Sequence, residues 1–138
     1  MKTVADDVIS INLRSFNEDK GSLIPIESGI DCLIDIERLF YVYKVPKGEI
    51  RGKHAHIETV QVLICLKGVC EVTCDDGKVR RTFTLDDPSK ALYLPKGIWG
   101  EQKYITDDTL LMVMCNTKYS YEDYIFNYDE FLKFRDVE

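Results

Sequence analysis

Short stretches of alternating apolar and polar residues, separated by turn residues, follow one another along most of the chain. Alternation with a period of two is typical of β-strands that place one face against a core. Thr59–Leu66 is almost continuously apolar, which favours a buried central strand, and Pro25 favours an edge position for its own strand. The other strands that the pattern predicts are Val8–Leu13, Leu23–Glu27, Glu37–Lys44, Val69–Cys74, Val79–Leu85, Ala91–Leu94, Gly100–Ile105 and Leu110–Asn116.

The turn signals between these strands predict how the chain is organised. Turns at roughly every eight to twelve residues between short strands indicate an all-β sandwich or barrel. Asp75–Gly77 reads as a hairpin turn. In the tail, Tyr121–Phe134 spaces its apolar residues with a helical period behind Ser120, a candidate N-cap. We expect one or two short helices there, laid against the barrel or a partner subunit, and a single domain over residues 1–138.

Net charge, apolar runs and cysteine spacing argue against several classes of protein. The formal net charge of -6 argues against a general nucleic-acid binder, although a local basic cluster can still hold an anionic small molecule. No apolar run has membrane-spanning length and the first residues lack the apolar core of a signal peptide, so we expect a cytoplasmic protein without membrane association. The cysteines, which contain no C-x-x-C pair, are expected to be buried free thiols. They are Cys32, Cys65, Cys70, Cys74 and Cys115.

His54 and His56 are the only histidines of the chain. At positions i and i+2 of a strand they face the same side, where two imidazoles can ligate a metal or move protons. They lie in the pattern G-x5-H-x-H-x4-Q-x6-G, which runs from Gly48 through Gln61 to Gly68. This pattern resembles the first signature of the cupin superfamily, in which His-x-His, a Glu and a later His bind a metal inside a β-barrel.

Two of those four ligands are absent here. The Glu position is Gln61, and Pro95–Gly100, which resembles the second signature P-x-G-x-x-H, has glycine in the place of the last histidine. Two imidazoles without a carboxylate or third imidazole bind a divalent cation weakly, so no metal and no other cofactor is expected. The simplest alternative is a pair of strand histidines hydrogen-bonded in a core or exposed at a rim. The rest of the spacing favours proton transfer or ligand binding instead.

Five segments together resemble the nucleotide-sugar 3,4-ketoisomerases, the WxcM-like family that acts on dTDP-4-keto-6-deoxy-D-glucose. The segments are Lys20–Glu27, Glu37–His56, Gln61–Val72, Leu85–Trp99 and Tyr119–Phe134. The resemblance implies a metal-free cupin jelly roll, a homodimer and a 3-keto-6-deoxyhexose product. A PLP-dependent aminotransferase then aminates such a product at C3 for bacterial surface polysaccharides or glycosylated natural products.

This chemistry requires removal of the C3 proton, an enediolate, and return of a proton to C4. An imidazole near its usual pKa is a suitable base, and a donor or cation must stabilise the oxyanion. By resemblance His54 and His56 contact the reacting carbons, and we expect His56 to be the C3 base and His54 to relay protons or hold the enediol. Arg51, Tyr41 and Tyr43 are candidates for the oxyanion or the pyrophosphate, although each aromatic can simply pack and the arginine can be solvated.

The remaining candidates concern substrate binding. A diphosphate needs cations, for which Arg38 and Lys20 join Arg51. Lys20 and Gly100 differ from many relatives and are expected to border the sugar and to influence a galacto or gluco product. Trp99 can stack on a base or fill the core. The full set of substrate-binding candidates is Tyr43, Arg38, Lys20, Gln61, Trp99, Gly100 and Glu101, the last as a neighbour that fills the gap at Gly100.

Three other functions stay open at this point. A nucleotide-sugar 3,5-epimerase also removes protons beside a C4 ketone, but typically uses a His–Asp pair and a Tyr acid. A non-catalytic cupin would bind a sugar or a metal without proton exchange. A cupin dioxygenase is the least favoured, because its metal ligands are missing.

Overall fold

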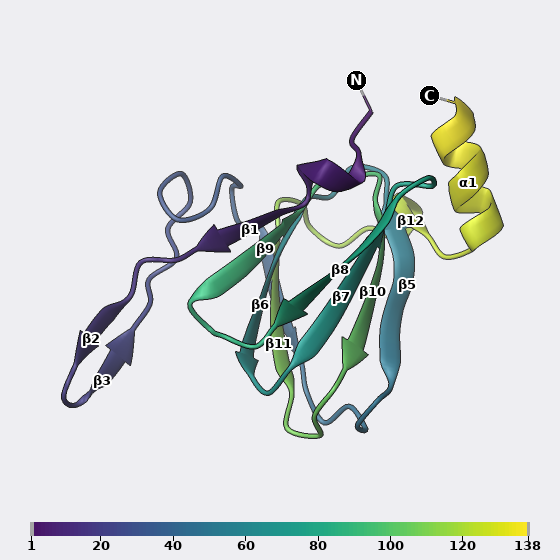
Figure 1. Cartoon of the computed structure of the whole chain (residues 1–138). Coiled ribbons are helices and arrows are strands. Elements are labelled where there is room, and N and C mark those ends of the chain that lie inside the picture. The colour runs from purple at the N-terminus through teal and green to yellow at the C-terminus, as the bar shows by residue number, and fades with distance from the viewer. Residues whose placement is uncertain (1, 138) are drawn as a thin grey trace.

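The computed structural model describes residues 2–137 and contains two facing antiparallel sheets (Figure 1). The first sheet has the order β1-β9-β6-β11-β4, and the second has the order β12-β5-β10-β7-β8. The strands of the first sheet are β1 (Ile9–Asn12), β9 (Lys90–Leu94), β6 (Gln61–Lys67), β11 (Leu110–Cys115) and β4 (Arg38–Val42). Those of the second are β12 (Tyr124–Ile125), β5 (Ile50–His56), β10 (Trp99–Tyr104), β7 (Cys70–Asp75) and β8 (Arg80–Leu85).

From β4 onward, the chain crosses repeatedly from one sheet to the other. β4, β6, β9 and β11 belong to the first sheet, whereas β5, β7, β8, β10 and β12 belong to the second. This winding is that of a jelly roll, which places strands distant in sequence side by side. The predicted all-β sandwich with a C-terminal helical segment is therefore confirmed.

The main core lies between the two sheets. β6 is buried from Gln61 to Cys65, as its continuous apolar run predicted, and contributes Leu63 and Cys65 to this core. Val72 and Cys74 from β7 of the second sheet face them, and Leu92 from the neighbouring strand β9 lies beside Leu63 in the same sheet. The cysteines are all free and buried, as expected from the sequence.

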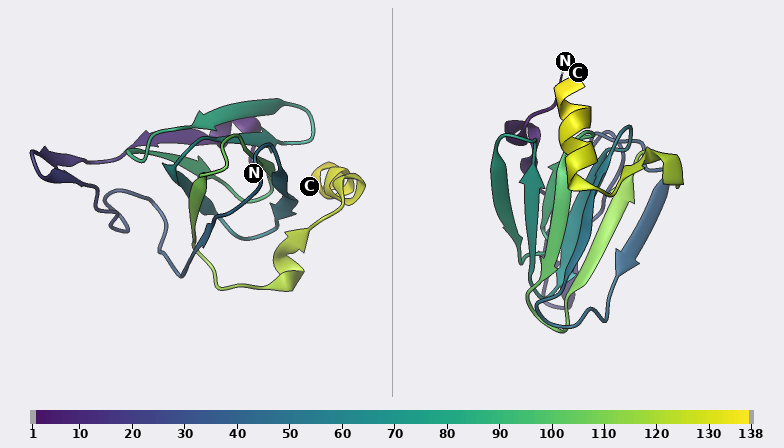
Figure 2. Two further views of the ribbon diagram at one scale, coloured as in Figure 1. Left: turned by 90° about the horizontal axis from the view of Figure 1, so that it is seen from below. Right: turned by 90° about the vertical axis from the view of Figure 1, so that its right-hand side faces the viewer.

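The C-terminal helix α1 (Tyr128–Val137) packs against one end of the outer face of the second sheet, as Figure 2 shows from the side. Phe131 of α1 is fully buried against Trp99 and Ala55. Burial of a phenylalanine side chain stabilises the fold by roughly 2–3 kcal/mol, so this residue is a main apolar anchor of the helix. No described helix is long and apolar enough to cross a membrane.

The predicted helical tail was wrong in one respect. A short 3-10 helix, η2 (Tyr121–Asp123), follows Ser120, but the next residues form β12 before α1 begins. β12 pairs with β5, placing Tyr124 opposite His56. An edge strand of a sheet gains backbone hydrogen bonds from such a partner, and this gain outweighs the local helical pattern.

A two-stranded arm projects away from the sandwich (Figures 1 and 2). It consists of β2 (Phe16–Glu18) and β3 (Gly21–Leu23), which pair with each other. The predicted strand Leu23–Glu27 was wrong beyond its first residue. Pro25 supplies no amide hydrogen to a ladder, and Ile24 and Ile26 instead pack against the first sheet's outer apolar cluster.

Candidate active site

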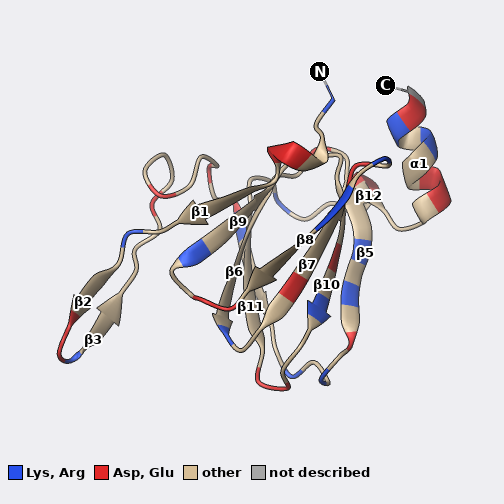
Figure 3. Cartoon of the chain, viewed as in Figure 1, with Lys and Arg blue, Asp and Glu red and all other residues tan. Residues whose placement is uncertain are grey.

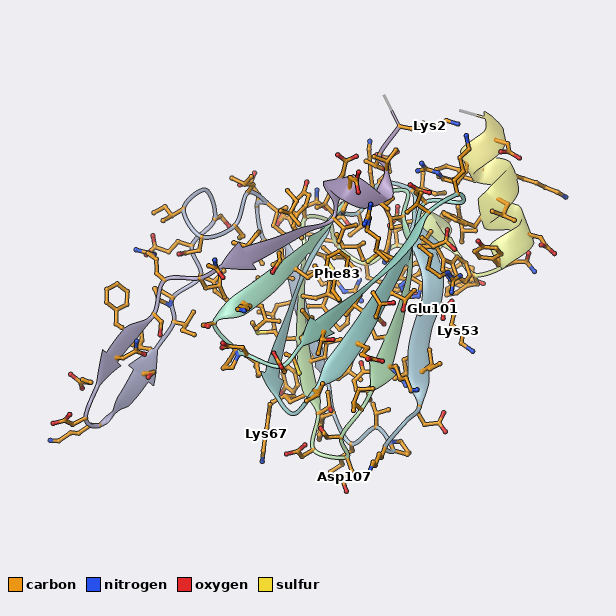
Figure 4. All side chains as sticks on the ribbon, in the orientation of Figure 1. Lys2, Lys53, Lys67, Phe83, Glu101 and Asp107 are labelled. Carbon is orange, nitrogen blue, oxygen red and sulfur yellow. The ribbon has the colours of Figure 1, made fainter. Side chains whose placement is uncertain are left out.

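A β-bulge in β5 brings Arg51 to the same side of the sheet as the two histidines. Gly100 of β10 pairs with His54 and Glu101 pairs with Gly52, so Lys53 is an extra residue without a partner. Gly52 and Lys53 have φ values of 87° and 53°. Because the inserted residue reverses the alternation, Arg51 faces the same side of the sheet as the histidines. Figure 3 shows the two basic positions of β5, and Figure 4 shows Lys53 pointing away from the barrel.

His54 is held in one tautomer. Its Nδ1 lies 3.0 Å from the carbonyl oxygen of Gly52, which can only accept, so Nδ1 carries the hydrogen and Nε2 keeps a lone pair. The pKa of His54 is lowered to about 4, first by burial and second by the neighbouring His56, against the opposing hydrogen bond to Gly52. The imidazole is thus neutral at pH 7, in the form that accepts a proton.

His56 is paired with a carboxylate. Its Nδ1 lies 2.8 Å from Oδ2 of Asp123, and its Nε2 is buried without a hydrogen-bond partner among the described residues. Burial lowers the pKa of His56, while the hydrogen bond to Asp123 opposes this effect. The carboxylate is itself fixed by the hydroxyl of Thr59 and the backbone N–H of Glu58. Burial alone would raise the pKa of Asp123, but these hydrogen bonds and His56 hold it below its ordinary value.

An aromatic wall closes the histidine pair on one side. The ring centroids of His54 and His56 lie 5.0 Å apart, and that of Tyr124 lies 5.0 Å and 4.4 Å from them, respectively. Phe126 stacks on Tyr124 at 5.2 Å. Arg38 donates a long hydrogen bond of 3.5 Å to the Tyr124 hydroxyl, so a cation lies beside the wall.

A cavity of about 90 Å³ opens beside His54, between the two sheets. It is lined by Phe40, Val42, Arg51, Gly52, His54, Gln61, Leu63, Gln102, Tyr104, Leu111 and Val113. Val42 and Arg51 also line an outer groove of about 520 Å³, together with Tyr41, Tyr43 and Lys44. The sequence candidates Arg51, Gln61 and His54 therefore share one cavity, and Arg51 connects it to the groove that holds both tyrosines.

The residues around the histidines do not fit a metal centre. Gln61 reaches Sγ of Cys115 through its amide, and Gly100 has no side chain. Among the described residues no group of three or more His, Cys, Asp or Glu side chains is placed to hold a metal ion. The donor set is therefore one of proton-transfer groups.

The family described as FdtA: WxcM-like, C-terminal matches residues 6–136 of this chain. The chain belongs to this family. A curated relative, the TDP-4-oxo-6-deoxy-alpha-D-glucose-3,4-oxoisomerase of Aneurinibacillus thermoaerophilus, is 37% identical over 124 residues, which are 90% of this chain and 89% of the relative.

Solved structures of family members share the fold over nearly their whole length. QdtA, a sugar 3,4-ketoisomerase from Thermoanaerobacterium thermosaccharolyticum in complex with TDP, is 34% identical, with a TM-score of 0.93 over 96% of this chain and 97% of that one. A His-to-Asn mutant of QdtA in complex with TDP-4-keto-6-deoxyglucose gives a TM-score of 0.91 at 34% identity, over 95% of both chains. The resemblance seen in the sequence is thereby confirmed, and the protein is a homologue of nucleotide-sugar 3,4-ketoisomerases.

Other sequence candidates lie apart from the histidines in this family fold. Trp99 is buried under α1, and its Nε1 donates to Glu101 at 2.9 Å on the outer face of β10. Tyr41 is 61% exposed on the outer side of β4. Lys20 occupies the tip of the arm, on the side of the molecule away from β5 and its histidines (Figure 1).

The structure adds three residues that sequence reasoning missed. Asp123 and Tyr124 reach the histidines only because η2 and β12 return to the edge of β5. Their positions in a stretch with helical spacing gave no signal of this contact. Gln102 follows the second signature by two residues, and only strand alternation from Gly100 places it on the inner face.

Proposed function

We propose that this protein is an isomerase that moves the keto group of TDP-4-keto-6-deoxyglucose from C4 to C3. The observation that carries the proposal is the pair of neutral imidazoles at 5.0 Å in a family of sugar 3,4-ketoisomerases. The product, a TDP-3-keto-6-deoxyhexose, is a substrate for amination at C3 in the synthesis of 3-amino sugars. The cytoplasmic location expected from the sequence stays a prediction.

The reaction needs one base that can take and return a proton. The C3 proton passes to an imidazole nitrogen, the electron pair of the C–H bond forms a C3–C4 double bond, and the C4 oxygen becomes negative. Transfer of the hydroxyl proton from O3 to O4 moves that charge to O3. Return of the imidazolium proton to C4 then completes the carbonyl at C3, with atoms and charge balanced.

Two observations support His54 as the base that meets the sugar, the reverse of the order expected from the sequence. His54 lines the cavity, and its hydrogen bond to the Gly52 carbonyl leaves Nε2 free to accept a proton. His56 lies behind it, and Asp123 stabilises its protonated form. We assign His56 the role of an electrostatic and proton-holding neighbour, and Asp123 that of the group that orients it.

The outer groove suits the nucleotide part of the substrate. Arg51 stands between the groove and the cavity and supplies a fixed cation for a pyrophosphate. Tyr41 and Tyr43, with ring centroids 6.1 Å apart, offer aromatic surface in the same groove. Arg38, beside Tyr124, is a second cation within reach of the histidines.

We also propose that the protein acts as a homodimer. The arm exposes Phe16 by 57% and Leu23 by 62%, which a second copy would cover. Lys20 at its tip borders a sugar only if that sugar lies in the other subunit. Light scattering should give about twice the subunit mass of 16.0 kDa, and a monomer would refute this assembly.

A second candidate function is a 3,5-epimerase, favoured by one observation. His56 and Asp123 form a His–Asp pair and Tyr124 lies 4.4 Å away, which is the set expected of that reaction. Family membership weighs against it, since the relatives named above are 3,4-ketoisomerases.

The deciding experiment is NMR of TDP-4-keto-6-deoxyglucose with the protein in D2O and EDTA, coupled to a C3 aminotransferase that traps the product. A 3-amino sugar identifies the ketoisomerase, and its H3–H4 coupling distinguishes galacto from gluco. Deuterium at C3 and C5 with the ketone kept at C4 identifies the epimerase. Absence of both turnover and exchange would leave a non-catalytic binding protein.

A further inference from the structure

Gln102 lines the cavity beside Gly100. Because Gly100 has no side chain, the Gln102 amide is the polar group at this point of the cavity wall. Gln102 pairs with Arg51 on β5 and lines the cavity together with His54 and Gln61. Unlike Gln61, whose amide reaches Cys115, the Gln102 amide lies over two glycines that offer no side-chain partner.

The contacts around the two glycines fix where this amide lies. A Cβ atom on Gly52 would be 2.5 Å from Oε1 of Gln102, closer than real Cβ atoms approach, so the amide occupies the space above Gly52. A Cβ atom on Gly100 would be 3.6 Å from Nε2 of Gln102, an ordinary contact distance. Nε2 is also 3.1 Å from the Cβ position of Gly52, but it is the only amide atom of Gln102 within 4 Å of the Cβ position of Gly100, the residue directly paired with His54.

We propose that Gln102 is a further catalytic residue, whose amide N–H donates to the oxygen of the enediolate during isomerisation. The amide takes the place of a polar side chain at Gly100, beside the base that moves the proton. This inference rests on the proposed 3,4-ketoisomerase function. A neutral donor suits a developing oxyanion because it stabilises the charge without protonating the adjacent base.

The test compares Gln102→Leu and Gln102→Glu with the wild type on TDP-4-keto-6-deoxyglucose. Glutamate keeps the shape but its ionised carboxylate cannot donate, so both variants should lower kcat by about 100-fold while KM changes little. Lys103→Leu, an exposed neighbour on the other face of β10, is the matched control and should keep the wild-type rate. Gly100→His in the Gln102→Leu background should restore part of kcat, because a Cβ atom fits at residue 100.

The outcomes separate this inference from the function beneath it. Wild-type turnover with kcat within twofold in both Gln102 variants would overturn the role of Gln102 and leave the isomerase intact. A rise in KM with kcat unchanged would also overturn it, since a donor to the enediolate acts after substrate binding. No turnover by the wild type would overturn both. Thermal melting of each variant identifies unfolding, and if Gln102→Leu unfolds, the Gln102→Glu variant decides.

Discussion

The two faces of the second sheet carry two polar clusters of opposite character. On the outer face, Trp99 donates to Glu101, and Asp75 accepts from Arg80 at 2.9 Å and from Tyr128 at 2.7 Å. On the inner face, Nε2 of His56 is buried without a partner among residues 2–137. The outer cluster is paired, whereas the inner one keeps free proton-accepting positions.

This difference shows that one face of the sheet carries polar groups that stabilise the fold, and the other carries groups that are available for a reaction. A paired buried polar group contributes modestly to folding, whereas an unpaired one costs free energy. A protein that retains an unpaired imidazole nitrogen therefore keeps a position for a ligand or a proton, as is common in active sites. The outer cluster fastens α1, and the inner one is available to a substrate.

The largest effect is expected from His54→Asn. Removal of the base should lower the rate of isomerisation by at least about 1,000-fold, while the melting temperature stays near that of the wild type. The D2O NMR assay checks the rate. Lys53→Asn is the matched control, since asparagine tolerates a positive φ and this side chain points outward. Retained exchange at C3 in His54→Asn would remove His54 from the mechanism.

Asp123→Asn should have the next largest effect, a decrease in kcat of about 100-fold, because an amide neither fixes the His56 tautomer nor stabilises its protonated form. Loss of Asp123 should also lower the pKa of His56 further, since the carboxylate is what raises it. Titration of the imidazole by NMR checks the direction. A raised His56 pKa in this variant would contradict the pairing.

A change of pH should affect kcat/KM less than either substitution above. With the folded pKa of His54 at about 4 and an ordinary value of 6.5, the free enzyme keeps its base neutral well below pH 6.5. The acid limb of kcat/KM is thus expected near pH 4. Between pH 4 and pH 6.5 the unfolded chain binds more protons than the folded protein at His54. The contribution of His54 to the free energy of unfolding is therefore complete above pH 6.5 and declines as the pH falls toward 4. A limb at pH 6.5 would contradict the burial of His54.

The smallest effect on activity is expected from Tyr128→Phe on the outer face. Loss of the hydroxyl that donates to Asp75 should destabilise the fold by about 1 kcal/mol and leave kcat unchanged. Urea unfolding and the isomerase assay measure the two quantities. A loss of kcat without a loss of stability would show that the two faces are coupled.

The sequence by itself determined most of the fold and the centre of the site. Alternating and apolar segments predicted β4 and the strands from β6 to β11, and the apolar run of β6 predicted its burial on both faces, because side-chain direction in a strand follows from position alone. The H-x-H pair identified the two imidazoles for the same reason. Gln61 and Gly100, at the positions of two cupin metal ligands, favoured proton transfer over metal chemistry from the sequence alone.

Only the tertiary structure decided what surrounds the histidines. The bulge at Lys53 turned Arg51 inward, which strict alternation does not predict. Asp123 met His56 from 67 residues away, because β12 completes the edge of β5. Such contacts depend on long-range strand pairing, whose free energy comes from burial and hydrogen bonds shared across the whole sheet. The local sequence pattern does not indicate which distant segment will pair with a given strand.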